Sequence, residues 1–282
     1  MAEIINGKIV SEKIRAELAD EVALLKEKYG ITPGLAVVIV GENPASLVYV
    51  RNKKRACEQV GINSYEIALP ATISEEELIA RISDLNVDPK IHGILVQLPL
   101  PEHISSESVI NAVDPMKDVD AFHPFNVGKI LIGSYSFLPC TPAGIIDLLD
   151  HYQISVSGKK CVVLGRSNIV GKPMAHLLLE RNGTVTVCHS RTQNLAEETR
   201  DADILVVAIG KPQFLTSEMV KSGAVVIDVG INRLDDGKLV GDVDFDDVSS
   251  VASYITPVPG GVGPMTICSL LKNTIKAAKS AK

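Results

Sequence analysis

The chain has 282 residues, a length that favours two domains over one. Hydrophobic residues make up 46% and charged residues 22%, which is the balance of a globular protein with ample material for a core; aromatic residues make up only 4%. The formal net charge of -6 argues against a nucleic-acid partner or an anionic membrane surface, whereas small anionic ligands respond to local charge and are not excluded.

Cysteine usage and the N-terminus predict a cytoplasmic protein with no metal site and no membrane partner. The five cysteines are scattered, none forms a C-x-x-C pair, and no histidine cluster lies near them, so we expect reduced thiols and no zinc. The N-terminus lacks a basic stretch followed by an apolar run, and runs such as ILVVAIG are too short to cross a bilayer.

Short apolar runs alternate with longer amphipathic segments along the first half, the pattern of a βαβ architecture. Three strands are predicted there, beginning at Gly34, Ser64 and Ile91. Three helices are predicted: about 10–28, about 45–60, and one opening at Ser74, where Ser74 and Glu77 have the spacing of a capping box.

The amino-acid composition changes over residues 114–142, where Pro, Gly, His and Asp accumulate. Thr141-Pro142 then predicts the start of a helix, with Thr141 as N-cap. Four strands follow, in KCVVLG, TVTVCHS, ADILVVAIG and AVVIDVG. Helices are predicted over 172–181, 194–200 and about 267–278. This half has the organisation of a Rossmann-like, doubly wound sheet that binds a mononucleotide or dinucleotide.

The first of these strands ends in GRSNIVGKP, where a glycine-relaxed turn leads into a helix. Backbone N–H groups at such a turn suit a pyrophosphate. Gly165 and Gly171 have five residues between them, which is not the common dinucleotide spacing, so a plain strand-to-helix turn is the alternative.

The end of the next strand bears on the choice of cofactor. NAD enzymes usually carry an acidic residue there, whereas this chain has Ser190 and Arg191 and no carboxylate before Glu197. Arg166 can reach the same corner, and guanidinium groups favour a 2′-phosphate. The sequence therefore predicts NADP; the alternative is that these arginines only solvate a loop.

Four polar residues in the first half are candidates for chemistry. Tyr49 and Lys53 lie four apart and share one face of a predicted helix, although RNKKR also fits a solvated helix face. Gln97 ends an apolar strand, where open α/β sheets place ligands. Asp120 can accept from a donor-rich heterocycle or serve as an Asx-turn residue.

Seven segments in order resemble the bacterial type of the bifunctional methylenetetrahydrofolate dehydrogenase/cyclohydrolase family. They are YVRNKKRACEQVGI, GILVQLPLP, KDVDAFHP, CTPAG, GRSNIVGKP, TVTVCHSRT and TPVPGGVGPMT. The resemblance implies oxidation of 5,10-methylenetetrahydrofolate with NADP and hydrolysis of the methenyl product to 10-formyltetrahydrofolate. The substrates would be tetrahydrofolate derivatives, with or without a polyglutamate tail.

The resemblance also implies residue roles. Lys53 is the expected catalytic lysine, Tyr49 orients the folate, Gln97 hydrogen-bonds the lysine and Asp120 anchors the pterin. The expected cofactor residues are Gly165, Arg166, Ser167, Ser190, Arg191 and Ile231. Further folate contacts are expected at Leu98, Pro99, Pro259, Gly260 and Gly261. A lysine with a pKa lowered by burial could take the proton of the attacking water.

The implied fold has a folate-binding domain over 1–140 together with the C-terminal helix 267–282. An NADP-binding domain follows over 141–266, with a folate-binding cleft between the two and a homodimer formed through the cofactor domain. The alternatives are a monofunctional dehydrogenase, a dehydrogenase of another small substrate and a silent dinucleotide sensor. Retention of Tyr49, Lys53, Gln97 and Asp120 argues against the first and the last.

Overall fold

The structure is a computed structural model that describes residues 1–281. It divides into two compact units. The three-stranded unit comprises Glu12–Cys140 and the chain from Ile267 onward, and the six-stranded unit comprises Met1–Ser11 and Thr141–Thr266. The chain therefore passes from one unit to the other inside two helices, α1 (Gly7–Tyr29) and α10 (Val262–Ser280), and at the start of α6 (Cys140–His151).

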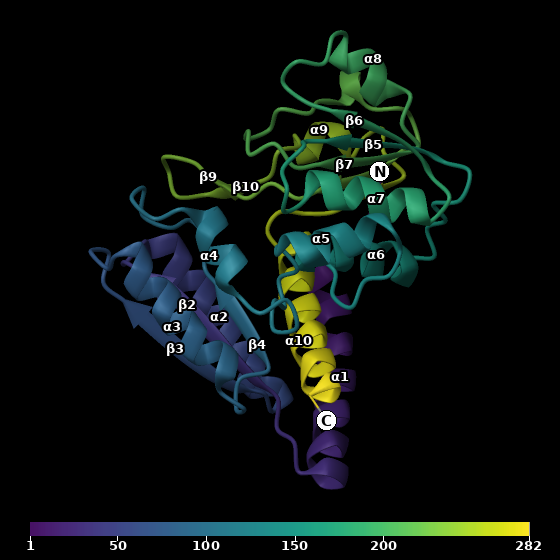
Figure 1. Cartoon of the computed structure of the whole chain (residues 1–282). Coiled ribbons are helices and arrows are strands. Elements are labelled where there is room, and N and C mark those ends of the chain that lie inside the picture. The colour runs from purple at the N-terminus through teal and green to yellow at the C-terminus, as the bar shows by residue number, and fades with distance from the viewer. Residues whose placement is uncertain (282) are drawn as a thin grey trace. The chain divides into compact units, whose positions relative to one another are not determined.

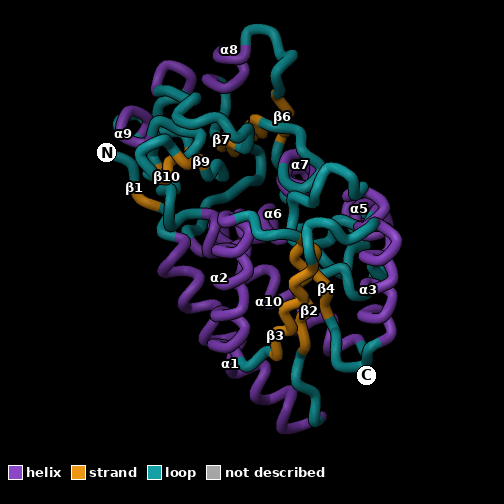
Figure 2. The backbone as a smooth tube through the Cα atoms, turned by 90° about the vertical axis from the view of Figure 1, so that its left-hand side faces the viewer, coloured by secondary structure: helices purple, strands orange, loops and turns teal. Residues whose placement is uncertain are grey.

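The three-stranded unit is built on a parallel sheet of order β3-β2-β4, whose strands run side by side in Figure 2. Its central strand, β2, is buried along its whole length, as expected for a strand covered on both faces. The strands are β2 (Gly34–Val40), β3 (Asn63–Leu69) and β4 (Gly93–Val96). The helices that lie wholly in this unit are α2 (Pro44–Val60), α3 (Glu75–Val87), α4 (Ser106–Ala112) and α5 (Pro124–Leu131).

Alternate residues of β2 feed two separate cores, because successive side chains of a strand point to opposite faces. Leu35, Val37 and Ile39 pack with apolar residues of α1, α2 and α10. Ala36, Val38 and Val40 pack with residues of α3, β4 and α4. The result is a three-layer arrangement in which helices pack on both faces of the sheet.

The six-stranded unit contains a parallel sheet of order β1-β11-β8-β7-β5-β6. Figure 1 shows α7 on one side of this sheet and α8 on the other. Residues of α8 and α9 pack together in one core against the sheet. The sheet strands are β1 (Glu3–Ile4), β5 (Lys160–Leu164), β6 (Thr184–Cys188), β7 (Ile204–Val207), β8 (Val225–Asp228) and β11 (Tyr254–Ile255). The other elements are α7 (Gly171–Glu180), α8 (Leu195–Arg200), η1 (Ser217–Met219), α9 (Phe245–Val248) and the antiparallel pair β9 (Asn232–Arg233) and β10 (Leu239–Val240).

Strand order makes β5 the point at which the winding of this sheet reverses. Its two neighbours are β6, the next strand in sequence, and β7, the one after it. Ligands of open parallel sheets bind outside the carboxyl ends of the strands at such a point. The turn after β5 is therefore placed where a dinucleotide is expected, and the predicted fold class, two α/β units with a doubly wound second half, is confirmed.

Three local predictions have clear outcomes. The capping box is confirmed, because Glu77 N–H donates to the Ser74 hydroxyl while the Ser74 N–H donates to the Glu77 carboxylate. The helix predicted to begin after Thr141 instead begins at Cys140, so Pro142 lies in its first turn, where a missing N–H is tolerated. The terminal helix begins at Val262, earlier than expected.

The first eleven residues differ from the predicted domain, because they belong to the six-stranded unit. Glu3 and Ile4 form β1, which pairs in parallel with β11, and Ile5 N–H donates to the Ile255 carbonyl oxygen at 2.8 Å. The unpaired edge of β11 thus gains a strand. A two-residue strand has no periodicity that a sequence could reveal. Within residues 1–281, no helix is long and apolar enough to span a membrane.

Candidate functional site

Lys53 and Gln97 meet in the three-stranded unit. Lys53 lies on α2, and its Nζ donates to Oε1 of Gln97 at 3.0 Å. Gln97 follows β4 directly, where its backbone N–H continues the ladder to the Val38 carbonyl oxygen at 2.8 Å, and its Nε2 donates to the Leu98 carbonyl oxygen at 2.7 Å. The amide is therefore held at both ends, which fixes the position of the lysine amine.

Asp120 completes this group of charged and polar side chains. Burial raises the pKa of its carboxyl group, while the positive charge of Lys53 acts in the opposite direction. The carboxylate also interacts with the thiol of Cys140, a residue that our sequence analysis did not select. Burial raises the pKa of Cys140 well above its ordinary value, and the Asp120 charge adds to that shift. Cys140 is thus an uncharged neighbour of the carboxylate.

The turn that presents Asp120 is organised by Asp118 instead of by Asp120 itself. The buried Asp118 carboxylate accepts from the N–H groups of Phe122 and His123 and from the Asn126 amide, at 2.8–3.2 Å. The turn-forming role that was the alternative for Asp120 therefore belongs to Asp118, two positions earlier. From α10, the Asn273 amide donates to the Val119 carbonyl oxygen at 2.8 Å and supports the same turn.

Tyr49 lies one turn before Lys53 on α2, as the four-residue spacing predicts. Its side chain is partly exposed, and burial of the remainder raises the pKa of the phenol. Leu98 and Pro99 follow Gln97 in a loop that contains a cis peptide bond between them. Leu98 is half-buried and Pro99 is exposed, so this loop presents apolar surface next to the Lys53–Gln97 pair.

The turn after β5 is closed by two glycines that admit no side chain. Gly165 has φ +127°, and a Cβ there would collide with the carbonyl oxygen of Ala208. A Cβ on Gly171 would collide with the carbonyl oxygen of Gly165. The turn is therefore packed against both the loop after β7 and the start of α7, a cradle of backbone that a larger residue would fill.

Ser167 holds the start of α7 within this turn. Its hydroxyl oxygen accepts from the N–H groups of Val170 and Gly171 at 3.2 and 3.3 Å, while Val170, the N-cap residue, makes no side-chain cap. The Ser167 hydroxyl hydrogen remains available as a donor. Arg166 is exposed beside it, so hydroxyl, guanidinium and backbone N–H groups gather at one helix N-terminus, a set that fits a phosphate.

Ser190 and Arg191 stand in a tight turn after β6. His189 and Thr192 form this turn, because the Thr192 hydroxyl accepts from His189 N–H at 2.8 Å and the His189 ring accepts from Arg191 N–H at 3.1 Å. The side chains of Ser190 and Arg191 are exposed. Among residues 1–281, the structure gives neither Arg166 nor Arg191 an acidic ion-pair partner, so both guanidinium groups can meet an anionic ligand.

The remaining predicted residues lie at the same edge of the six-stranded sheet. Ile231 follows β8 and is 47% exposed. Pro259, Gly260 and Gly261 follow β11, and the Gly260 carbonyl oxygen accepts from Lys8 N–H at 3.1 Å. A Cβ on Gly7 would collide with the Gly261 carbonyl oxygen, which is a further reason that the N-terminal segment belongs to this unit.

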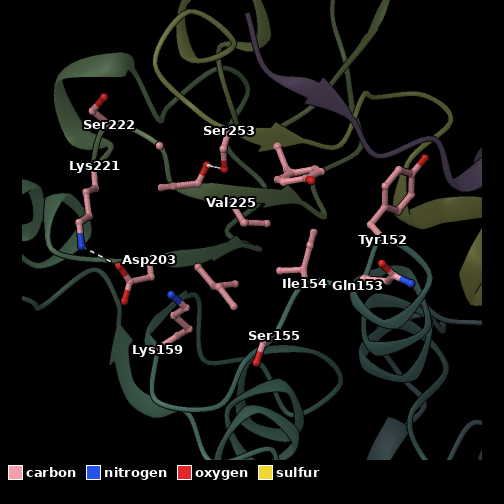
Figure 3. A pocket seen from close by; sticks show the side chains of 14 residues that line it. Tyr152, Gln153, Ile154, Ser155, Lys159, Asp203, Lys221, Ser222, Val225 and Ser253 are labelled. Carbon is pink, nitrogen blue, oxygen red and sulfur yellow. Dashed lines mark hydrogen bonds and ion pairs between the residues drawn. The ribbon is translucent and has the colours of Figure 1, made fainter.

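A pocket of about 300 Å³ lies at the opposite, amino-terminal edge of the same sheet. Figure 3 shows its lining, in which Lys221 points toward Asp203 and their charged groups are 2.6 Å apart. Tyr152 and Val225 also line it, and none of the residues predicted to bind cofactor or substrate does. The pocket therefore lies apart from the residues that the sequence predicts to bind the dinucleotide.

The five cysteines are free and buried. No group of three or more His, Cys, Asp or Glu side chains that could hold a metal ion occurs within residues 1–281.

Comparison with known proteins assigns both units to one family. Residues 5–120 match the family described as tetrahydrofolate dehydrogenase/cyclohydrolase, catalytic domain, and residues 139–282 match its NAD(P)-binding domain. The bifunctional protein FolD of Acetivibrio thermocellus is 64% identical over 278 residues, 99% of this chain and 97% of that protein.

Solved structures agree over the whole length. The bifunctional enzyme FolD of Campylobacter jejuni has a TM-score of 0.97 at 53% identity, covering 99% of each chain. The methylenetetrahydrofolate dehydrogenase-cyclohydrolase of Trypanosoma brucei, solved with NADP and an inhibitor, has a TM-score of 0.96 at 41% identity, covering 99% of this chain and 98% of that one.

Fold and site thus define an α/β enzyme with a nicotinamide-dinucleotide domain. The chain belongs to the tetrahydrofolate dehydrogenase/cyclohydrolase family and is a bifunctional enzyme, a dehydrogenase and a cyclohydrolase that acts on folate derivatives.

Proposed function

We propose that this chain oxidises 5,10-methylenetetrahydrofolate to 5,10-methenyltetrahydrofolate with NADP and then hydrolyses that product to 10-formyltetrahydrofolate. The observation that carries the proposal is the Lys53–Gln97 contact of 3.0 Å at the carboxyl end of β4, in the electrostatic range of Asp120. A base and an acceptor within one small group of side chains can serve two reactions on one folate.

The oxidation needs positioning more than a base. The cation that forms at the methylene carbon is stabilised by both flanking nitrogens, so the residues only have to orient the folate. Asp120 accepts from adjacent N–H donors of the pterin, and Tyr49 stacks near the reacting end. NADP, when bound, accepts the hydride.

The hydrolysis needs an activated water. Water adds to the methenyl carbon and gives a proton to the Lys53 amine, which leaves a hydroxyl group on that carbon. The bond from the carbon to N5 then breaks as N5 takes up the proton held by Lys53, and the hydroxyl group loses its own proton to solvent as the formyl C=O forms, so that one proton is released overall. Gln97 accepts from Lys53 Nζ and keeps the amine aimed at the water. General-base help of this kind is typically worth roughly 10²–10⁴-fold in rate.

For the cofactor, we assign the phosphates to the turn at Gly165, Arg166 and Ser167, and the adenosine end to Ser190 and Arg191. Two exposed guanidinium groups and the absence of a carboxylate before Glu197 favour a 2′-phosphate, hence NADP. The NADP complex of the Trypanosoma brucei relative supports this choice. Ile231 is assigned to the nicotinamide.

The folate walls are assigned to two loops. Leu98 and Pro99 present apolar surface next to Gln97. Pro259, Gly260 and Gly261 form a loop without bulky side chains at the carboxyl end of β11. In these assignments the residues that act on the folate belong to the three-stranded unit, whereas the six-stranded unit carries the cofactor and the 259–261 loop. Polyglutamated folates belong to the same substrate class.

A homodimer through the six-stranded unit is part of the proposal, as is a cytoplasmic location. Strand β6 forms one edge of the sheet, and Thr184, Thr186 and Val187 on it are exposed. A strand edge with exposed β-branched residues is suited to pairing with a second copy. Light scattering would give twice the chain mass for the parent, and Val187→Lys would shift the mass toward that of the monomer.

The proposed cytoplasmic location rests on the five free thiols, which are typical of that compartment.

An absorbance assay tests the reaction sequence. The enzyme is mixed with 5,10-methylenetetrahydrofolate and NADP, and NADPH and the methenyl product are followed together. We expect NADPH to form while the methenyl signal rises and then decays faster than its spontaneous hydrolysis. Formation of NADPH with only spontaneous decay of the methenyl product would show a monofunctional dehydrogenase, and a folded protein that forms no NADPH would refute the proposal.

A further inference from the structure

Two buried aspartates occupy the carboxyl edge of the six-stranded sheet, and the proposed reaction uses neither. Asp228 ends β8 and is 3% exposed, and Asp242 follows β10 and is fully buried. Buried carboxylates are rare unless their oxygens are satisfied. Their partners therefore indicate what these two residues hold in place.

Asp228 binds the backbone around Asp242. Its Oδ1 accepts from Gly230 N–H at 3.0 Å and from Asp242 N–H at 2.9 Å, and its Oδ2 accepts from Val243 N–H at 3.0 Å. A Cβ on Gly241 would collide with the Asp228 carboxylate, so the glycine before Asp242 permits this close approach.

Asp242 in turn binds two segments that follow different strands. Its Oδ2 accepts from the N–H groups of Ile209 and Gly210, just after β7, at 2.7 and 2.9 Å. Its Oδ1 accepts from the Asn232 amide at 2.9 Å. One side chain thus links the loop after β7 to the segment after β8.

Ile231 lies between these anchors. Gly230 before it is bound to Asp228, and Asn232 after it is bound to Asp242. The loop after β7 also reaches the phosphate turn, because Gly165 packs directly on Ala208. The network therefore sets the relative position of the phosphate turn, the loop at Ile209–Gly210 and Ile231.

We infer that Asp242, held by Asp228, is a positioning residue for hydride transfer: it fixes the Ile209–Gly210 loop and Ile231 at the nicotinamide. This inference rests on the proposed function. Hydride transfer is sensitive to small displacements of the reacting groups, whereas hydrolysis of supplied methenyltetrahydrofolate uses no nicotinamide. Disturbing the network should therefore slow oxidation selectively.

The Asn232–Asp242 contact allows a test by exchange of groups. Asn232→Asp places two carboxylates face to face at the 2.9 Å contact, and their repulsion should push the two segments apart. Adding Asp242→Asn restores an amide–carboxylate pair in reverse, while the new amide oxygen still accepts from Ile209 and Gly210. Asp242→Asn alone should be mild, since the Asn232 amide can turn to present its oxygen.

We expect Asn232→Asp to lower the dehydrogenase kcat at least 10-fold, with a smaller change in KM for NADP, whose phosphates and adenosine are bound elsewhere. Cyclohydrolase activity on supplied methenyltetrahydrofolate should stay within twofold of the parent. The double variant should recover kcat to within threefold. Asp235→Asn, a charge removal at an exposed position in the β9–β10 turn, is the matched control and should equal the parent.

A second readout needs no turnover. Hydrogen exchange of the cofactor-free protein should accelerate at the Ile209 and Gly210 amides in Asn232→Asp and return to the parental rate in the double variant. Asn232→Ala, which only removes the donor, should show a smaller change in the same direction and serves if Asn232→Asp does not fold.

The inference is overturned if Asn232→Asp and Asn232→Ala keep the parental dehydrogenase rate, if Asp242→Asn fails to rescue Asn232→Asp, or if both activities fall in proportion. A parent enzyme without either activity would instead refute the proposed function.

Discussion

The two regions proposed to act on one substrate are built in different ways. In the three-stranded unit, side chains interact with side chains. Lys53 donates to Gln97, and Asp120 interacts with the charge of Lys53 and with the thiol of Cys140. In the six-stranded unit, the cofactor edge is mostly backbone, with glycines closing the phosphate turn and Asp228 and Asp242 accepting largely from backbone N–H groups.

This difference fits the role that is proposed for each region. Water activation requires a titratable group at a defined place, so single side chains carry it. Binding a dinucleotide requires many oriented donors and close approach, which glycine turns and a helix N-terminus provide. Single substitutions should therefore have their largest effects on rate in the first region and smaller effects in the second.

The largest effect is expected at Lys53. Lys53→Met keeps the apolar stem and removes the amine, so hydrolysis of supplied methenyltetrahydrofolate should fall by about 10²–10⁴-fold. Changing Gln97 should impair hydrolysis less, because the amine remains. Lys54→Met, at the exposed neighbouring position, is the control and should hydrolyse at the parental rate. Parental hydrolysis by Lys53→Met would make Lys53 an ordinary residue of a basic helix face.

Asp120 should affect both reactions together. Asp120→Ala leaves pterin N–H donors unpaired, which costs roughly 1–3 kcal/mol, or about 5- to 150-fold in kcat/KM for each activity. The Kd for NADP without folate should remain parental, and Glu102→Ala, an exposed acid of the same unit, should change neither rate. A collapse of Tm without a selective kinetic loss would indicate that Asp120 serves the turn.

In the cofactor region we expect an effect of about tenfold. The parent should prefer NADP over NAD by at least about 10-fold in kcat/KM, or about 1.4 kcal/mol. Arg191→Ala should erode that preference while NAD is used as before, and Arg200→Ala, an arginine of the same unit bound to the Glu218 carbonyl oxygen, should preserve it. Equal efficiency of the parent with both cofactors would refute the assignment of the arginines.

The smallest effect concerns pH and stability. Burial raises the pKa of Asp228 to about 7, and backbone N–H donors only partly oppose this shift. Between about pH 4 and 7 the folded state then binds more protons than the unfolded state, so this group makes stability fall as pH rises.

Asp228→Asn removes that titration. The Tm of the parent relative to this variant should therefore decrease by a few degrees between pH 5 and pH 8, as measured by calorimetry. A Tm difference that is constant over this range would show that Asp228 does not titrate there.

Much of the fold could be predicted because its elements have strong local signals. The apolar run of β2 and the Ser74–Glu77 capping box determine structure within a few residues. The strand β1 and the pair β9–β10 have only two residues per strand and depend on pairing with other segments, so no hydrophobic periodicity in the sequence predicts them. Helix α5 was missed because its signal is short: His123 as N-cap before Pro124 within a turn-rich segment.

The candidate site was predictable in part for the same reason. The four-residue spacing of Tyr49 and Lys53 places both on one helix face, but no local pattern brings Lys53 to Gln97, 44 residues away. From the sequence alone, Cys140 is indistinguishable from an ordinary core cysteine, and Asp228 and Asp242 are indistinguishable from residues that end a strand or form a turn. Only the folded chain shows that their partners are side chains and N–H groups of other segments.

The division of labour between the two units is tested most directly by measuring both activities in two variants side by side. Oxidation of methylenetetrahydrofolate with NADP and hydrolysis of supplied methenyltetrahydrofolate are assayed for Lys53→Met and for Arg191→Ala. We predict opposite selectivity: Lys53→Met retains measurable oxidation and loses hydrolysis, whereas Arg191→Ala hydrolyses at the parental rate and oxidises more slowly with NADP. If either variant lowers both activities in the same proportion, the two regions do not divide the reactions in this way.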